Sequence, residues 1–191
     1  MSLSNVNMTN DFTENNAAQV IEKPFLIRAI LLISTVAGWC SASMILIAVF
    51  ITCQMIFVRS VLNESTIWQT ETVIYLVIAA TLIGLPFVQK VRGHVNVDLI
   101  PLMLPKRARY YLAIFTLLIT ALVVAVMFWY GLEYWHIALE GNWVSDTVTE
   151  VPLWIPYSAL PIGFGLFFLQ LMADFFSLIL KIESPFWLGE K

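Results

Sequence analysis

Four long runs of apolar residues constrain this chain more than any other feature. They lie at about 26–57, 67–88, 106–134 and 153–180, and few charged side chains interrupt them. A helix of about 20 mainly apolar residues crosses the ~30 Å hydrocarbon layer of a bilayer. Only 12% of the residues are charged, whereas soluble domains carry roughly 25%. The sequence therefore predicts an all-α integral membrane protein with four transmembrane helices.

The segments outside these runs set the domain organisation. Residues 1–22 are polar and lack the basic start and short apolar centre of a signal peptide. We expect a flexible cytoplasmic tail over 1–22, a four-helix membrane domain over 23–182 and a second cytoplasmic tail over 183–191.

A basic stretch, Lys90–Tyr111, separates the second and third runs and holds five of the ten Lys and Arg residues. Its apolar middle is too short to span a bilayer, and cationic ends flank it, so we expect a short cytoplasmic helix in the interface plane. The residues predicted to fix topology or lie at the interface are Lys90, Arg92, His94, Asp98, Lys106, Arg107 and Arg109.

The distribution of Lys and Arg predicts the orientation. With four spans, nine of the ten lie on the same side as both termini, and Arg59 alone lies on the other. Cytoplasmic loops carry the excess of Lys and Arg. Both termini are therefore expected in the cytoplasm, and the loop predicted over His136–Val151, which contains no Lys or Arg, is expected outside.

Several small and polar residues inside the runs suggest contacts with a partner. Ser34, Gly38 and Ala42 recur every four residues, and such stripes let helix backbones approach closely. Glu71, one turn into its run, either snorkels to the interface or pairs with a polar group of a neighbouring helix or subunit. The full set of candidate partner-interface residues is Ser34, Gly38, Ala42, Trp68, Glu71, Gly163, Gln170 and Asp174.

No residue pattern indicates catalysis, a metal or a cofactor. His94 and His136 are expected on opposite sides of the membrane, and nucleotide-binding, zinc-protease and serine-hydrolase motifs are absent from the sequence. The carboxylates of Glu71, Glu133 and Asp174 fall near span ends, which favours an accessory subunit over a carrier. A haem-linked membrane anchor of a redox complex and a stand-alone channel or exporter remain alternatives.

Three motifs resemble one family along nearly the whole chain. They are Trp68-Gln-Thr-Glu71, the run Gly93-His-Val-Asn-Val-Asp98, and Pro161-Ile-Gly163-Phe followed by Gln170. Together they are similar to the small membrane subunit (DctQ-like) of tripartite ATP-independent periplasmic (TRAP) transporters. One departure is Thr70, where members of the family often have a second acidic residue before the glutamate.

The resemblance implies a function that composition alone does not. It implies a bacterial inner-membrane protein that anchors a large TRAP membrane subunit, which imports a carboxylate-type solute by a sodium-driven elevator motion. A periplasmic substrate-binding protein would deliver the solute and touch the complex transiently. Sodium is expected on the partner subunit only, so the resemblance assigns this chain no cofactor. It also implies no enzymatic activity and no binding of nucleic acid. Membrane lipid is the remaining expected partner.

Overall fold

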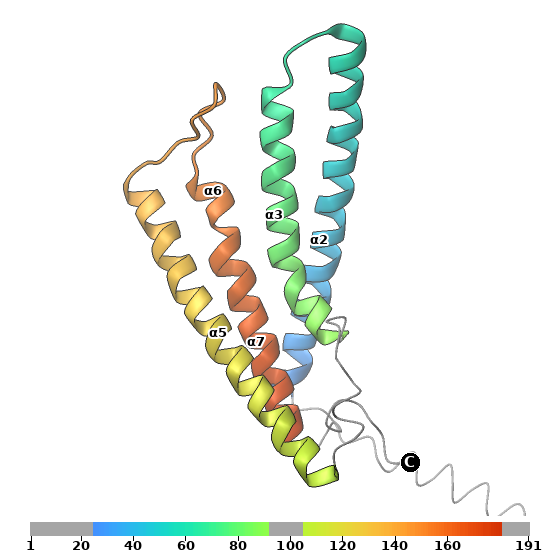
Figure 1. Ribbon diagram of the computed structural model, residues 1–191, viewed down its shortest axis with the longest axis vertical. Coiled ribbons are helices and arrows are strands. Elements are labelled where there is room, and N and C mark those ends of the chain that lie inside the picture. Colours follow the sequence, from blue (N-terminus) through green and yellow to red (C-terminus); the bar gives the residue numbers. More distant parts are fainter. Residues whose placement is uncertain (1–24, 92–104, 181–191) are drawn as a thin grey trace, which may run out of the picture.

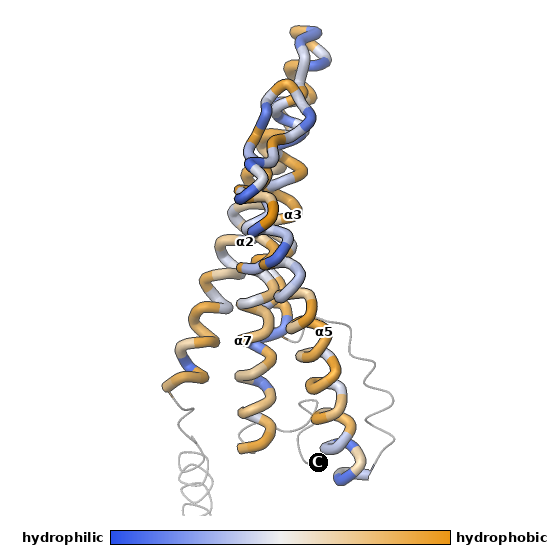
Figure 2. The backbone as a smooth tube through the Cα atoms, turned by 90° about the vertical axis from the view of Figure 1, so that its left-hand side faces the viewer, coloured by the Kyte–Doolittle hydropathy of each residue, from blue (hydrophilic) through white to orange (hydrophobic). Residues whose placement is uncertain are grey.

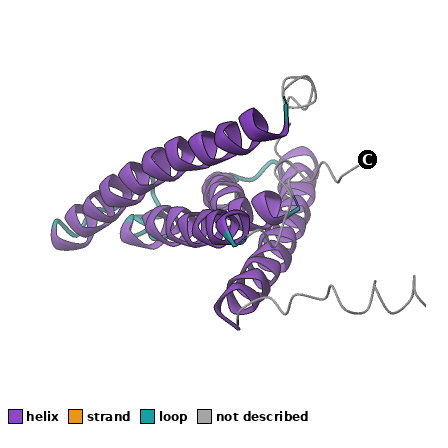
Figure 3. Cartoon of the chain, turned by 90° about the horizontal axis from the view of Figure 1, so that it is seen from below, coloured by secondary structure: helices purple, strands orange, loops and turns teal. Residues whose placement is uncertain are grey.

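A computed structural model describes residues 25–91 and 105–180, without the side chain of Lys106. Within these ranges the elements in chain order are α2 (Phe25–Phe57), the π-helix η1 (Val58–Leu62), α3 (Ile67–Lys90), α5 (Lys106–Glu140), α6 (Trp154–Tyr157) and α7 (Ala159–Ile179). Seen from below, these elements are helices joined by short loops (Figure 3).

Four helical segments of the described ranges are long and apolar enough to cross a membrane. They are Phe25–Leu62, Ile67–Lys90, Arg107–Glu140 and Trp154–Ile179. Apolar residues predominate along their length, and hydrophilic residues gather at the connecting turns (Figure 2). The all-α architecture with four spans is confirmed. The predicted interfacial helix and both tails lie outside the described residues.

The helices form two hairpins. α2 packs on α3, α7 packs on both α3 and α5, and α2 also reaches α7. The hairpins approach each other at one end and diverge towards the other (Figure 1). A small apolar core joins α5 to α7 through Ala121, Val124, Phe167 and Leu171. α7 is the most enclosed span, because it packs against α5 of its own hairpin and against α3 of the other.

α2 does not stop at its last α-helical turn. It continues into η1, and Asn63 then takes a left-handed conformation with φ 53°. Asparagine tolerates this conformation better than most residues, so it suits the end of a helix. Arg59 lies in η1.

The third span is longer than predicted, and the loop after it is shorter. α5 continues to Glu140, so His136–Glu140, predicted as loop, is helical. Nothing between Tyr134 and Glu140 breaks a helix. The helix ends where Asn142 takes a left-handed conformation with φ 48° and Trp143 donates its backbone N–H to the Ala138 carbonyl at 3.1 Å. The predicted fourth span is divided at Ser158 into α6 and α7. Pro161 has no N–H to donate to the Tyr157 carbonyl, which weakens the helix at this point.

Pro86 shapes the contact between the hairpins without ending α3, which continues to Lys90. A proline removes the backbone bond to the carbonyl four residues earlier, here that of Leu82. That carbonyl lies where α7 crosses: a Cβ added at Gly163 would lie 2.8 Å from the Leu82 oxygen and 2.7 Å from its Cβ. The absence of a side chain at Gly163 therefore allows α7 to lie directly against α3.

Candidate functional site: two polar clusters that join the hairpins

Two groups of polar side chains connect the hairpins at different levels. The loop clamp consists of Glu71 and Tyr75 on α3 with Ser145, Thr147 and Thr149 of the α5–α6 loop. The helix network consists of Ser34 on α2, Gln89 on α3, and Gln170 and Asp174 on α7.

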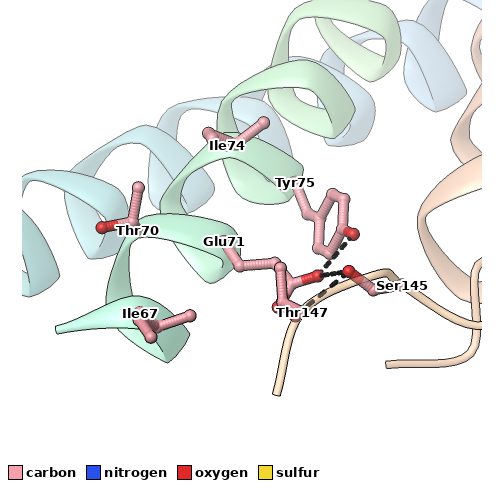
Figure 4. Close-up of a pocket in the computed structure, with 7 residues that line it drawn as sticks. All are labelled: Ile67, Thr70, Glu71, Ile74, Tyr75, Ser145 and Thr147. Carbon is pink, nitrogen blue, oxygen red and sulfur yellow. Dashed lines mark hydrogen bonds between the residues drawn. The ribbon is translucent and has the colours of Figure 1, made fainter. Parts of the chain in front are cut away.

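In the loop clamp, one carboxylate gathers four hydroxyl donors. Tyr75 donates to Glu71 Oε1 at 2.8 Å, and Thr147 donates to Oε2 at 2.7 Å. The hydroxyls of Ser145 and Thr149 donate to Oε1 and Oε2 respectively. Glu71 is only 7% exposed, and two donors on each oxygen satisfy its acceptor capacity. Figure 4 shows the carboxylate of α3 directed at the loop.

The loop is folded so that its hydroxyl groups reach Glu71. Leu153 donates its N–H to the Trp143 carbonyl at 2.8 Å, and Ser145 donates to Val151 at 2.9 Å. These bonds pair the two arms of the loop, and a tight turn with Glu150 at φ 43° closes it. The loop is thus a short hairpin laid from the α5–α7 side onto the start of α3.

A shallow cavity of about 430 Å³ adjoins the clamp. Ile67, Thr70 and Ile74 line it on the α3 side, and the remaining lining residues belong to the clamp. Since the clamp hydroxyls already satisfy the Glu71 oxygens, the carboxylate is engaged in holding the loop. Among the described residues, no group of three or more His, Cys, Asp or Glu side chains could hold a metal ion.

The helix network is a buried chain of hydrogen bonds through three helices. Ser34 donates to Gln170 Oε1 at 2.7 Å, and Gln170 donates through Nε2 to Asp174 Oδ1 at 2.9 Å. Gln89 donates to the other carboxylate oxygen of Asp174 at 2.9 Å. Ser34 is 1% exposed and Gln170 is completely buried. In an apolar surrounding, each of these polar groups requires its partner, so the network fixes how α2, α3 and α7 align.

Lys90 adds a link near this network. Its ammonium group donates to the Leu31 carbonyl at 3.1 Å and to the Thr35 hydroxyl at 2.5 Å, so it joins the end of α3 to α2. Arg107 and Arg109 lie in the first turn of α5. Arg92, His94 and Asp98 lie outside the described residues.

Six of the eight candidate partner-interface residues contact other residues of this chain, and their role towards a partner stays a prediction. Ser34, Gln170 and Asp174 belong to the helix network, and Glu71 belongs to the loop clamp. Gly38 lies against the Phe87 ring, and Gly163 lies against Leu82. The spacing of residues in a sequence predicts which face of a helix packs, but it does not predict which helix packs on that face. Ala42 and Trp68 are exposed, and their place at a partner interface stays a prediction.

Sequence reasoning missed the loop half of the clamp. Ser145, Thr147 and Thr149 recur at every second position, so in a folded-back loop their hydroxyls can gather on one side. That alternation, opposite a carboxylate near the start of a span, was the available signal. Gln89 was missed because its partner, Asp174, is distant in sequence.

The fold and the two clusters define a class: a multi-pass α-helical membrane protein whose buried polar groups join its own helices. Residues 48–181 match the family described as tripartite ATP-independent periplasmic transporters, DctQ component. The match covers most of the chain, which therefore belongs to this family of transporter components.

Two characterised relatives are similar over much of the chain. The C4-dicarboxylate TRAP transporter small permease protein DctQ of Vibrio cholerae is 25% identical over 135 residues, which cover 58% of this chain and 57% of the relative. The isethionate TRAP transporter permease protein DctMQ of Oleidesulfovibrio alaskensis is 27% identical over 158 residues, which cover 80% of this chain and 22% of the relative. The chain thus spans little more than half of one relative and about a fifth of the other.

Proposed function

We propose that this chain is the small, stationary membrane subunit of a TRAP transporter. It holds a large membrane subunit that moves a carboxylate-type solute by an elevator motion driven by a sodium gradient. A soluble periplasmic binding protein delivers the solute. The subunit lies in the bacterial inner membrane with both termini in the cytoplasm, in keeping with the nine-to-one division of Lys and Arg.

The observation that carries this proposal is the connection of the two hairpins at two levels. The helix network joins α2, α3 and α7, and the loop clamp joins the α5–α6 loop to the start of α3. A part that stays still while a neighbour moves must keep its own helices in register. Buried hydrogen bonds between helices serve this purpose in an apolar surrounding, where an unpaired polar group is costly.

A large membrane partner is supported by one relative in particular. This chain covers only 22% of the permease protein DctMQ. In that relative, the part matching this chain is joined to a much longer remainder in a single polypeptide. We propose that the corresponding partner is a separate chain here, and that it packs on the apolar helix faces that this chain leaves exposed. α2 and α5 carry the largest such faces, because only 11% of the most apolar stretch of each span is buried.

The test is to delete the chain and measure solute uptake in cells that keep the other two transporter components. Loss of sodium-dependent uptake, restored by the full chain from a plasmid, is the expected result. Unchanged uptake without the chain would contradict the proposal.

A further inference from the structure

The negative charge of Glu71 has no cationic partner. All four of its hydrogen bonds come from neutral hydroxyl groups, and the residue is almost completely buried. No Lys, Arg or His of the described ranges pairs with it. Buried charges are normally paired with an opposite charge or a metal ion. The cavity of about 430 Å³ beside the clamp therefore borders a carboxylate whose charge is not neutralised.

The hydroxyl groups that line this cavity all present the same kind of hydrogen-bonding atom to it. A hydroxyl has one hydrogen to donate and two positions that accept. Tyr75, Ser145 and Thr147 direct their hydrogens at the carboxylate (Figure 4), so they offer acceptor oxygens to anything in the cavity. Thr70 donates to a backbone carbonyl of its own helix at 3.0 Å, which commits its hydrogen too. The polar side of the cavity therefore suits a positively charged group with several N–H donors.

Apolar side chains continue from the cavity along α3. Ile67 and Ile74 line the cavity, and Val77 and Ile78 follow one turn further on the same face. These four residues, which we call the α3 stripe, are 44–50% exposed. Below them Leu85 packs against the core between α5 and α7. From Ile74 to Leu85 the helix rises about 16 Å, which is roughly half of the ~30 Å hydrocarbon layer and thus the depth that one acyl chain occupies.

We propose that the cavity and the α3 stripe together bind a phospholipid with a primary-amine headgroup, phosphatidylethanolamine. The ammonium group lies in the cavity, where its three N–H groups donate to hydroxyl oxygens and its charge balances that of Glu71. The hydroxyl oxygens of Ser145 and Thr147 are 3.1 Å apart, so one ammonium nitrogen can reach both. One acyl chain lies along the stripe. This inference goes beyond the proposed function and does not depend on it.

The chemistry of the cavity decides among the possible occupants. Phosphatidylglycerol has a net negative charge, which Glu71 repels, and phosphatidylcholine has a positive charge but no N–H to donate. A metal ion would balance the carboxylate but leave the α3 stripe uncovered. An apolar helix of a partner would cover the stripe but bring no ammonium group to the cavity.

The experiment is native mass spectrometry of the full-length chain, released from micelles that contain phosphatidylethanolamine, phosphatidylcholine or phosphatidylglycerol with identical acyl chains. Glu71→Gln removes the charge. Thr70→Phe fills the cavity from the α3 side and leaves every group of the clamp in place. The matched control is Thr72→Phe, because Thr72 also bonds to a carbonyl of its own helix but does not line the cavity.

The wild-type chain is expected to retain one phosphatidylethanolamine molecule about fivefold better than either other lipid, the effect of a single partly exposed charge interaction. Glu71→Gln and Thr70→Phe should abolish this preference, whereas Thr72→Phe should keep it. Since Glu71→Gln also loosens the loop, Thr70→Phe is the decisive variant. Equal retention of the three lipids by the wild type, or an equal loss in Thr70→Phe and Thr72→Phe, would overturn the inference.

Two further measurements test the other occupants. Amide hydrogen exchange of the loop is compared in sodium chloride without lipid and in phosphatidylethanolamine without sodium; the lipid alone should slow it. Slowing by sodium alone would mean that a metal ion occupies the cavity. A complex with the large membrane subunit that carries no phosphatidylethanolamine would mean that this subunit covers the stripe. Either result overturns the inference and leaves the proposed function standing.

Discussion

Gly163→Ala tests the close approach of the two hairpins. The added Cβ would lie 2.7 Å from Leu82 Cβ and 2.8 Å from both the carbonyl carbon and the oxygen of Leu82. Two of these three atoms belong to the α3 backbone, which cannot rotate away as a side chain can. α7 and α3 must therefore move apart. Inserting a methyl group into a tightly packed site typically costs about 1–3 kcal/mol, and we expect about 2 kcal/mol here.

A cost of about 2 kcal/mol raises the equilibrium constant for unfolding roughly thirtyfold. The assay is a denaturant titration of the purified chain in detergent micelles, which measures the free energy of reversible unfolding. Gly165→Ala is the matched control on the same helix. Its Cβ would meet only the Phe128 ring, at 3.1 Å, and that side chain can give way. If Gly163→Ala is as stable as wild type, or no less stable than Gly165→Ala, the crossing is not as close as the structure has it.

Four further substitutions test the contacts that hold the helices and the loop together. Glu71→Gln leaves the loop without its carboxylate acceptor, so residues 143–152 should exchange amide hydrogens faster while the helices keep their protection; unchanged exchange would mean the clamp does not hold the loop. Gln170→Leu should destabilise the chain by about 1–3 kcal/mol, since it breaks two buried bonds, and Ser34→Ala, which removes one, by about 0.6 kcal/mol. The reverse order in micelle unfolding would contradict the network. Gly38→Leu places a side chain where its Cβ alone would lie 2.4 Å from the Phe87 ring, so a clear drop in melting temperature is expected, and none would mean that α2 packs elsewhere.

The sequence was sufficient for the number and kind of helices. Length and hydropathy identify membrane spans directly, because an apolar run of 20 or more residues has few alternatives to a spanning helix. Helix ends were less well predicted. The predicted third span ended at residue 134, whereas α5 continues to Glu140 and ends just before the left-handed residue Asn142.

The site was only half predictable, for a physical reason. Glu71 was identified as a group that needs the interface or a polar partner, because a carboxylate in an apolar span must be satisfied. Ser34 and Gln170 were identified only as candidate interface residues. Their partners could not be named, since the pattern is the same whether the neighbouring helix belongs to this chain or to another. The alternating hydroxyls of Ser145, Thr147 and Thr149 gain meaning only once the loop is seen to fold back onto α3.

The most direct test of the stationary-subunit account is the composition of the complex purified from membranes through a tag on this chain. The account predicts a stable, equimolar complex with one much larger polytopic membrane protein, the large TRAP subunit, that persists in detergent. Purification of the tagged chain by itself, from membranes that contain the large subunit, would contradict it.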